Sequence, residues 1–504
     1  MNDARRHSGF LWSLLIAALV VLLPATAHAH GRLKSSRPAA GARLTQVPAS
    51  LRLDFSESPD LTFTSLRLLS SAGRDIPLGA VAYSADSRRS IDVRVAAALE
   101  PGTYTVIWQM AGDDGHVTRG RFDFTIAAGA TGIGIDPVGV APANPTAASA
   151  KAMDSTAMAN MHHDPQSMPE GTGFGADSPL YVFIRWLQFI GLLLAIGAVS
   201  FHAFVLAFIR RDPHSLAQAD EPAMLTVVEA RAASIGCIAA ALLAATLVLR
   251  LIAQGYAMHG TTIASNPSLM IPMLGKTMWG WGWLLQLAGM VFVAVGFLRA
   301  RKARGGIDGR AETPRLGHWH LWWRLAALGA VLLAFSLGMS SHASSSPKLR
   351  ALAMLADGLH VLGASSWLGS LAVVLFAGVS VAASRKSHSG EFVRDMINAF
   401  SPVALVSAGI ATTTGVFAAW LHVGTVPNLW GSRYGLILLT KLTILGIVSI
   451  TGFYNWRFVK PRLGTPSATM HLRRSARVEV AVAILVLLVT AVLVASPTSM
   501  DMTM

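Results

Sequence analysis

Cysteine is nearly absent from this chain, since Cys237 is the only one among 504 residues and it lies inside an apolar run. The sequence therefore predicts no disulfide and no thiolate metal site, so any bound metal would need ligands from histidine, methionine or carboxylate side chains. Charge is also scarce, because charged residues make up 13% of the chain and hydrophobic residues 53%. Such a chain is too apolar for a soluble protein, and most of it is expected to lie in a membrane.

Acidic residues are outnumbered, with 27 Asp and Glu against 41 Lys and Arg and a formal net charge of +14. A basic chain can indicate nucleic-acid binding, which would require basic residues interleaved with aromatic ones on one patch. Here the basic residues fall in short loops between long apolar runs, a distribution typical of membrane topology. The expected macromolecular partner is therefore a lipid bilayer and not a nucleic acid.

Residues 1–29 have the features of a cleavable secretory signal, namely a basic start, an apolar run and an Ala-His-Ala cleavage site at 27–29. Cleavage there would make His30 the first residue of the mature protein and free its α-amine. An amine and an imidazole on one residue can chelate one metal ion, and both nitrogen donors suit Cu(II). Asp114 and His116 offer a carboxylate and a second imidazole that would complete such a site.

Residues 30–127 contain short runs in which apolar and polar residues alternate, as at 51–55, separated by Gly, Pro, Ser and Asp. This alternation is the period of a half-buried strand. Strands are predicted at 50–57, 62–69, 90–96, 103–110 and 119–126. A domain of about 100 residues with such strands is typical of a small all-β sandwich, here of the immunoglobulin or cupredoxin type.

Residues 128–178 lose this periodicity and are rich in Ala, Pro, Gly, Asp and Met, which predicts a flexible tether. Thioether sulfur selects Cu(I), and a flexible segment can wrap a soft ion without preformed geometry. The tether is therefore a candidate weak Cu(I) site, and the Met-rich tail at 498–504 has the same chemistry. The candidate ligands in the tether are Met153, Met158, Met161, His162, His163 and Met168.

Eight apolar segments in the second part of the chain are long enough to span a bilayer, which takes about 20 residues each. They are predicted at 180–208, 228–253, 279–298, 321–338, 351–382, 399–421, 434–456 and 476–496. If the β-domain lies in the periplasm, most Lys and Arg residues of this part fall in cytoplasmic loops, as the positive-inside rule requires. The sequence thus predicts an α-helical membrane domain at 179–497, with the N-terminal domain and the C-terminus both in the periplasm.

Ionisable residues inside membrane spans are costly and indicate function. Asp357 and His360 are three residues apart, which places them on one face of a helix. The predicted topology puts His360 in the outer part of its span, and His259, His342 and His422 in outer loops or at span ends. These five side chains are the candidate uptake site for a metal ion.

The remaining ionisable residues of the spans have two expected roles. Lys441, Glu479 and Arg250 are expected to pair with each other or with backbone carbonyls and so to hold helices together. His202 lies near the inner end of the first span and would serve release of the ion.

Several short stretches resemble known protein families. In the β-domain these stretches are His30 and residues 35–41, 51–57, 101–106 and 114–124, and they resemble the periplasmic copper-binding family CopC. The membrane part resembles CopD, the polytopic copper-resistance partner, through residues 341–343, 357–360, 367–369, 434–435, Lys441, Asn455, Arg474 and Glu479. The chain therefore resembles a CopC–CopD fusion over nearly its whole mature length.

The resemblance to CopC implies a type-2 Cu(II) site in which the amine and ring of His30 combine with Asp114 and His116. Some CopC proteins add a methionine-rich Cu(I) site on the sandwich. Residues 30–127 contain only Met110, so no such site is expected on this β-domain.

Together the two resemblances imply an inner-membrane copper transporter, and not an enzyme, that serves copper homeostasis and resistance, with import as the expected direction and periplasmic copper carriers as expected partners. The alternative is a copper or haem oxidoreductase, because an N-terminal histidine with a second histidine also forms the copper site of monooxygenases. Asp114 as a third strong ligand argues against an open, oxygen-activating site. His202 and His360 lie at opposite depths, which argues against one haem shared between them.

Overall fold

The computed structural model divides the chain into two compact units. One unit groups the described residues of His28–Gly175 with those of Gln254–Trp279, and the other groups those of Ala176–Ala253 and Gly280–Met500. The residues that the structure describes are 33–112, 117–130, 133–134, 139–140, 178–211, 221–260, 262–305, 316–340, 349–384, 389–460 and 466–496.

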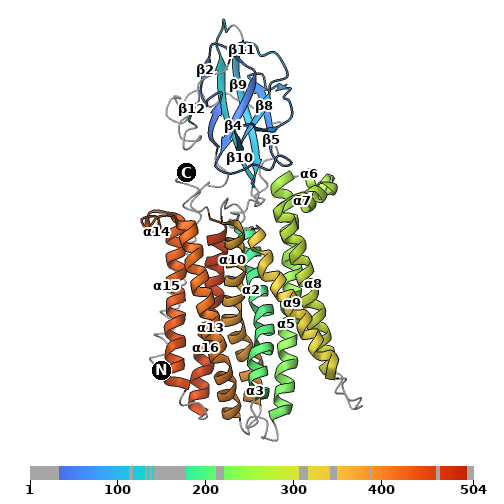
Figure 1. Cartoon of the computed structure of the whole chain (residues 1–504), viewed down its shortest axis with the longest axis vertical. Coiled ribbons are helices and arrows are strands. Elements are labelled where there is room, and N and C mark those ends of the chain that lie inside the picture. The colour runs from blue at the N-terminus through green and yellow to red at the C-terminus, as the bar shows by residue number, and fades with distance from the viewer. Residues whose placement is uncertain are drawn as a thin grey trace, which may run out of the picture. The chain divides into compact units, whose positions relative to one another are not determined.

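The β-domain consists of two five-stranded sheets (Figure 1). The first sheet has the order β12-β1-β4-β8-β7, formed by Gly139–Val140, Leu33–Arg37, Ser50–Phe55, Ser87–Arg94 and Ala82–Ser84. The second has the order β2-β10-β9-β5-β6, formed by Arg43–Leu44, Val117–Ile126, Gly102–Ala111, Ser65–Ser70 and Asp75–Ile76. A short parallel pair joins β3 (Val47–Pro48) to β11 (Ile133–Gly134).

The core of this domain lies between the two sheets because alternate side chains of each strand point inward. Leu51, Leu53 and Phe55 of β4 are buried, as are alternate residues of β9. The ring of Phe55 meets the ring of Trp108 edge to face, with centroids 5.4 Å apart. The sandwich predicted from the sequence is therefore confirmed.

The five predicted strands correspond to β4, β5, β8, β9 and β10, with ends that differ by a few residues. The prediction missed β1 and the strands of two or three residues, which are too short to show a period. Two further short strands lie within the predicted tether at 128–178, since β12 pairs with β1 and β11 pairs with β3.

Gly120 of β10 has no room for a side chain, since a Cβ atom there would lie 2.5 Å from Cζ2 of the Trp108 indole. We expect Gly120→Ala to lower the free energy of unfolding of the β-domain by about 1–3 kcal/mol, the usual cost of overpacking. The check is the urea concentration at which chymotrypsin first cleaves the β-domain of the purified chain. Arg121→Ala, an exposed neighbour on the same strand, is the control and should leave that concentration unchanged.

The helical part of the chain is built from long helices with short interruptions. The long helices are α2 (Pro179–Ser200), α5 (Glu221–His259), α8 (Met278–Gly305), α9 (Leu316–Ser336), α10 (Arg350–Ala364), α13 (Ser389–Val423), α15 (Arg433–Tyr454) and α16 (Pro466–Val494). Shorter helices are α3 (Ala207–Arg211), α6 (Thr262–Ser265), α7 (Met270–Lys276), α11 (Ser370–Val373), α12 (Ser380–Ser384) and α14 (Asn428–Gly431). In the part of the chain that the structure describes, four π-helical turns continue or join these helices: η2 (Phe201–Leu206), η6 (Ser365–Gly369), η7 (Val374–Val379) and η8 (Asn455–Val459).

Among the described residues, seven helices are long and apolar enough to cross a membrane, and they coincide with seven of the eight predicted spans. The eighth prediction, 321–338, corresponds to α9, whose apolar part His320–Ser336 is shorter than the others. The described helices therefore confirm seven of the eight predicted spans, and α9 lies at the position of the eighth.

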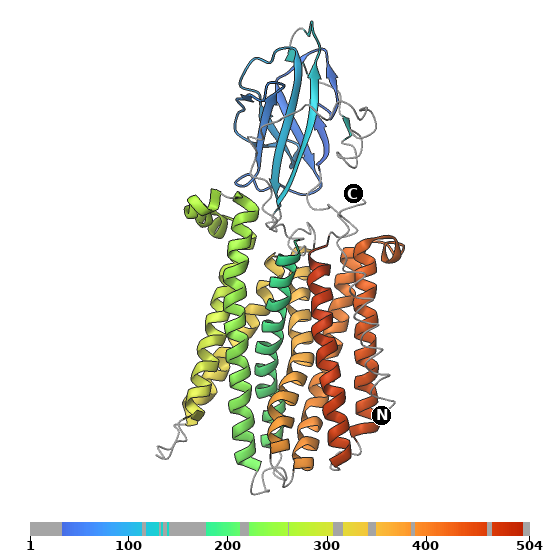
Figure 2. The same ribbon diagram turned by 180° about the vertical axis from the view of Figure 1, so that it is seen from behind.

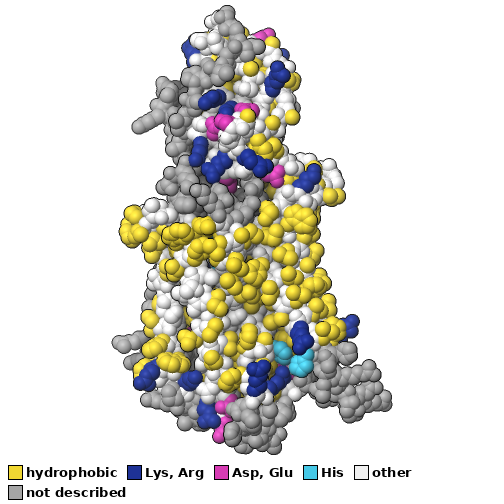
Figure 3. Space-filling view, in the orientation of Figure 1, with side chains coloured by type: hydrophobic (Ala, Val, Ile, Leu, Met, Phe, Trp, Pro, Cys, Tyr) yellow, Lys and Arg dark blue, Asp and Glu magenta, His cyan; other side chains and the backbone are white. Residues whose placement is uncertain are grey.

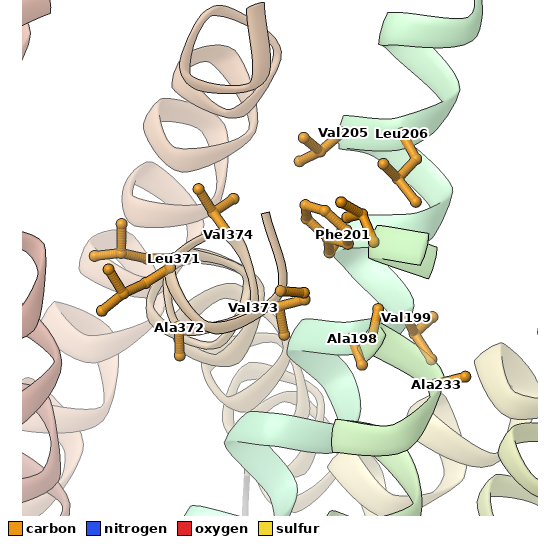
Figure 4. Packing of buried hydrophobic residues seen from close by; sticks show 14 of the residues in the cluster. Ala198, Val199, Phe201, Val205, Leu206, Ala233, Leu371, Ala372, Val373 and Val374 are labelled. Carbon is orange, nitrogen blue, oxygen red and sulfur yellow. The ribbon is translucent and has the colours of Figure 1, made fainter. Parts of the chain in front are cut away.

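Helix α2 lies in the middle of the bundle, where it contacts α9, α16 and η6 (Figures 1 and 2). Its Gly197 faces Gly369 of η6 so closely that a side chain on either residue would overlap the other backbone. A large apolar cluster surrounds this contact, and Figure 4 shows side chains of η2 meeting those of α11 and η7 in it. Along the outside of the helices, hydrophobic side chains form a broad band, with Lys and Arg gathered at one end (Figure 3).

Candidate metal sites

Helix α10 carries two of the predicted site residues, Asp357 and His360, one turn apart. Glycines hold this helix against its neighbours, because Gly358 lies against Phe335 of α9 and Gly363 lies against α13. A Cβ atom on Gly363 would be 2.9 Å from the carbonyl oxygen of Ser407. His360 lies about 15 Å along α10 from its first residue, at 1.5 Å per residue.

The contacts of the His360 ring determine which of its nitrogens is available to a ligand. Nδ1 lies 2.9 Å from the carbonyl oxygen of Ala411 and 3.3 Å from Oγ1 of Thr414, both on α13. A carbonyl oxygen only accepts hydrogen bonds, so Nδ1 must carry the proton, and in the neutral ring Nε2 keeps a free lone pair. Histidines that bind metals are commonly oriented in this way by a carbonyl or carboxylate.

Space around the ring is limited on the α13 side. A Cβ atom on Gly415 would lie 3.1 Å from Cε1 of His360, so a larger residue there would displace the imidazole. A Cβ atom on Gly409, which is on the same helix, would meet no other atom within 4 Å. A side chain at Gly415 would therefore disturb the His360 ring, whereas one at Gly409 would not.

Lys441 of α15 interacts electrostatically with Asp357 and with His360. Opposite charges inside a membrane protein stabilise each other, whereas a single buried charge is costly. The sequence predicted that Lys441 would pair with Glu479, Arg250 or backbone carbonyls and did not predict its electrostatic interaction with Asp357. Asp357 lies far from Lys441 in the sequence, and only the packing of the helices brings the two together.

Glu479 and Arg250 have other polar partners. Asn455 Nδ2 donates to Glu479 Oε1 at 2.6 Å, which joins η8 to α16. Arg250 Nη1 donates to Gln286 Oε1 at 3.0 Å, which joins α5 to α8. Both contacts hold helices together, as expected, but through amides and not through each other.

The other residues of the predicted uptake site are dispersed or lie outside the described part of the chain. His422 is near the end of α13, with its ring 6.2 Å from the ring of Tyr434, and His259 is the last residue of α5. His342 lies outside the described residues. Within the described ranges, no three His, Cys, Asp or Glu side chains are close enough together to hold a metal ion.

A second histidine site surrounds His202 in η2, for which the sequence predicted a role in release but no partners. Its Nδ1 lies 2.7 Å from Oε1 of the buried Glu229, whose Oε2 accepts from Arg210 Nη2 at 2.5 Å. The His202 ring stacks on Trp323, with centroids 4.0 Å apart. The signal that could have revealed the site is Glu229 itself, an acidic residue inside an apolar helix.

The predicted ligands of the β-domain all lie outside the described residues. These are His30, and Asp114 and His116, which follow the end of β9 in the sequence and precede β10. Met110 of β9 is fully buried in the sandwich core, so its sulfur is not at the surface. The tether ligands Met153, Met158, Met161, His162, His163 and Met168 and the tail 498–504 also lie outside the described part.

A cluster of charges on the β-domain is structural. Arg52 donates to Asp54 and Asp86 at 3.0 and 2.9 Å, and Ser35 donates to Asp54 at 2.6 Å. The hydrogen bond from Arg52 lowers the pKa of Asp86 to about 2. Burial raises the pKa of Asp54, but hydrogen bonds from Ser35, Ser90 and Arg52 outweigh it and hold that pKa below its usual value. These contacts connect β1, β4 and β8, and no histidine takes part.

The fold and these sites define a polytopic membrane protein with an all-β domain and histidines placed between its helices. Residues 33–127 match the family described as CopC domain, residues 176–351 match Copper resistance protein D-like, N-terminal domain, and residues 394–493 match Copper resistance protein D. The chain therefore belongs to the copper resistance family in which a CopC domain and a CopD membrane domain are joined. Asp357 and His360 lie between the two CopD matches, whereas Lys441 lies inside the second.

The chain is also similar to individual copper-handling proteins. Copper transport protein CutJ of Bacillus subtilis (strain 168) is 24% identical over 96% of this chain and 77% of its own length. Copper resistance protein C of Pseudomonas syringae pv. tomato is 30% identical over 21% of this chain and 87% of its own length. The crystal structure of PcoC, a methionine-rich copper resistance protein from Escherichia coli, is 30% identical and covers 19% of this chain and 99% of that chain, with a TM-score of 0.18.

Proposed function

We propose that this protein binds copper with its β-domain and moves copper across the inner membrane into the cytoplasm. The observation that carries the proposal is His360, an intramembrane histidine whose Nδ1 proton is engaged by Ala411 so that Nε2 is free for a soft or borderline metal ion. The names of the relatives, a copper transport protein and a copper resistance protein, support copper as the substrate.

In this proposal the signal peptide 1–29 is removed, and the β-domain captures Cu(II) through His30, Asp114 and His116. Two imidazoles and an amine supply nitrogen donors, and the carboxylate offsets part of the charge of the ion. The methionines and histidines of the tether would hold Cu(I) weakly. Tethering the capture domain to the transporter raises the copper concentration at the membrane without any new contact.

The proposed orientation places the β-domain and the C-terminus in the periplasm. It is supported by the basic residues at the opposite helix ends, such as Arg211 at the end of α3, Lys302 near the end of α8 and Lys460 after η8. Positive loops stay in the cytoplasm. Helix α13 then ends in the periplasm and α10 begins there, so His422 and His342 lie on the side from which copper arrives.

Within the membrane, His360 would bind the arriving ion and Asp357 would offset its charge, while Lys441 would balance the charge of Asp357 when the site is empty. Release would follow through His202, whose ring Glu229 orients in the way that carboxylates orient metal-binding histidines. The hydrogen bond between Ser200 and Ser366, 2.7 Å long, lies beside η2 and η6 and connects the helices that carry the two histidines.

The positions of the candidate copper ligands in the sequence favour import over export. An exporter would collect copper on the cytoplasmic side, where the predicted loops are short and basic and contain no cluster of Cys or Met. The candidate ligands lie in the β-domain, the tether and the tail, all on the proposed periplasmic side.

The test is the copper content of cells that express the protein, measured by mass spectrometry against cells with an empty vector at equal external copper. We expect several-fold more copper in the expressing cells. If expression instead lowers cellular copper, import is the wrong direction and the β-domain receives exported ion.

A further inference from the structure

A cavity of about 450 Å³ opens between the start of α13 and the π-helical turn η8 that follows α15. It is lined by Arg394 and Asn398 of α13 and by Trp456, Arg457 and Lys460. Three of these five side chains are cations, one is an amide, one is an indole, and none is a carboxylate. The lining therefore offers many hydrogen-bond donors and a positive field, which suits an anion.

Two of the cations contact neighbouring side chains, one on α13 and one on η8 itself. Lys460 Nζ donates to Ser401 Oγ on α13 at 3.1 Å, so this side chain bridges the two helices. The Arg457 guanidinium lies over the ring of Phe458, 5.5 Å from its centroid. The turn η8 is π-helical, a geometry frequent at functional sites because it changes which side chains share a face.

The charges around the cavity do not cancel. Arg394 lies 3.5 Å from Asp395, and this is the one ion pair that the described contacts give to the three cations. The region thus keeps an excess of positive charge, and like charges repel unless an anion lies between them. A phosphate group is a suitable anion for this cavity, because guanidinium groups bind phosphate oxygens through two parallel hydrogen bonds.

The surroundings indicate that the phosphate is part of a lipid. Four aromatic side chains in or next to this turn are largely exposed: Phe453 at 59%, Tyr454 at 57%, Trp456 at 56% and Phe458 at 47%. Aromatic residues gather at the level of lipid headgroups in a membrane. Farther along the same helices, Leu405 of α13 and Ile450 of α15 are exposed as well, which provides an apolar surface for acyl chains.

We propose that this cavity is a binding site for the phosphate headgroup of an anionic phospholipid, which joins α13 to η8. Basic pockets between membrane helices are a general means of binding such headgroups. The proposal does not depend on copper or on the direction of transport. It requires only that the helices span a membrane and that Arg394, Arg457 and Lys460 keep their charge.

The test uses the purified full chain in neutral detergent, with phosphatidylglycerol, phosphatidylcholine or inorganic phosphate added in separate samples. Native mass spectrometry counts bound lipid, and thermal unfolding reports stabilisation. The variant Arg394→Gln/Arg457→Gln/Lys460→Gln removes the cavity charges. The control Arg299→Gln/Arg301→Gln/Lys302→Gln removes three exposed charges from α8, which does not line the cavity.

We expect the unaltered chain and the control to bind phosphatidylglycerol at least tenfold more tightly than phosphatidylcholine, and to unfold at a higher temperature with it. The cavity variant should lose both effects. Arg457→Lys keeps the charge but loses paired hydrogen bonds, so it should bind several-fold more weakly than the unaltered chain even where the triple variant does not fold.

Two results would overturn the proposal. Equal binding of phosphatidylglycerol by the Arg457→Lys variant, the cavity variant and the unaltered chain would show that the lipid binds elsewhere. Equal stabilisation by inorganic phosphate alone, with no added effect of phosphatidylglycerol, would show that the cavity takes free phosphate and not a lipid. If the unaltered chain binds the lipid but does not transport copper, the lipid site is supported and only the proposed function is contradicted.

Discussion

A mature chain that begins at His30 is expected to bind one Cu(II) ion far more tightly than the same chain with one extra glycine before His30. The added residue converts the α-amine ligand into an amide, which does not bind Cu(II) as an amine does, and it breaks the chelate ring. Loss of an outer-shell partner of a metal ligand costs about 10–100-fold in affinity, and loss of a direct ligand should cost at least as much.

The measurement is competition of the β-domain with a chelator of known affinity, monitored by the paramagnetic resonance spectrum of Cu(II). The domain should be cut after residue 140 and not after 127, because β12 pairs with β1 and β11 pairs with β3. A matched control carries the extra glycine after residue 140, where it should have no effect. Equal affinity with and without the N-terminal glycine would remove the α-amine from the site.

Substitution of His360 is expected to abolish the copper accumulation that the protein confers. His360→Ala removes an intramembrane ring that α13 orients through its Nδ1 proton, and within the described residues no cluster of three His, Cys, Asp or Glu side chains could replace it as a metal site. Cellular copper should fall to the level of the empty vector, while the amount of protein in the membrane stays the same. Unchanged accumulation in this variant would contradict a role for His360.

Two glycines of α13 provide a matched test of the same site. Gly415→Val places atoms against the His360 ring and should lower accumulation several-fold, because the imidazole must move. Gly409→Val, on the same helix, places its Cβ atom where no neighbour lies and should leave accumulation unchanged. If both variants transport equally well, the position of the ring does not matter to transport.

The sequence alone predicted the strands whose alternation is long enough to show a period. In β4, Leu51, Leu53 and Phe55 alternate with polar residues, and burial follows that pattern. The short strands β11 and β12 were missed because two residues carry no period, and their pairing with distant strands depends on the whole sandwich. The helix α9 begins at Leu316 and ends at Ser336, so its ends differ by a few residues from the predicted 321–338.

In the candidate metal site, too, some features followed from local sequence and others only from the packing of the helices. Asp357 and His360 share a helical face, and this follows from a spacing of three residues that any helix imposes. The sequence predicted other partners for Lys441, because its electrostatic interaction with Asp357 joins residues on two different helices and leaves no local signal. The contact between Glu229 and His202 also leaves no local signal, since it joins two elements, η2 and α5.

What the sequence by itself determined is the class of each segment: an N-terminal β-domain, apolar helices long enough for a membrane, and the chemical types of the candidate ligands. These depend on composition and local period, which a chain carries before it folds. Only the tertiary structure decided which nitrogen of His360 is free, which carboxylate lies near Lys441, and that three cations line one cavity. Each of these depends on contacts between helices distant in the sequence, and such contacts exist only once the helices are packed.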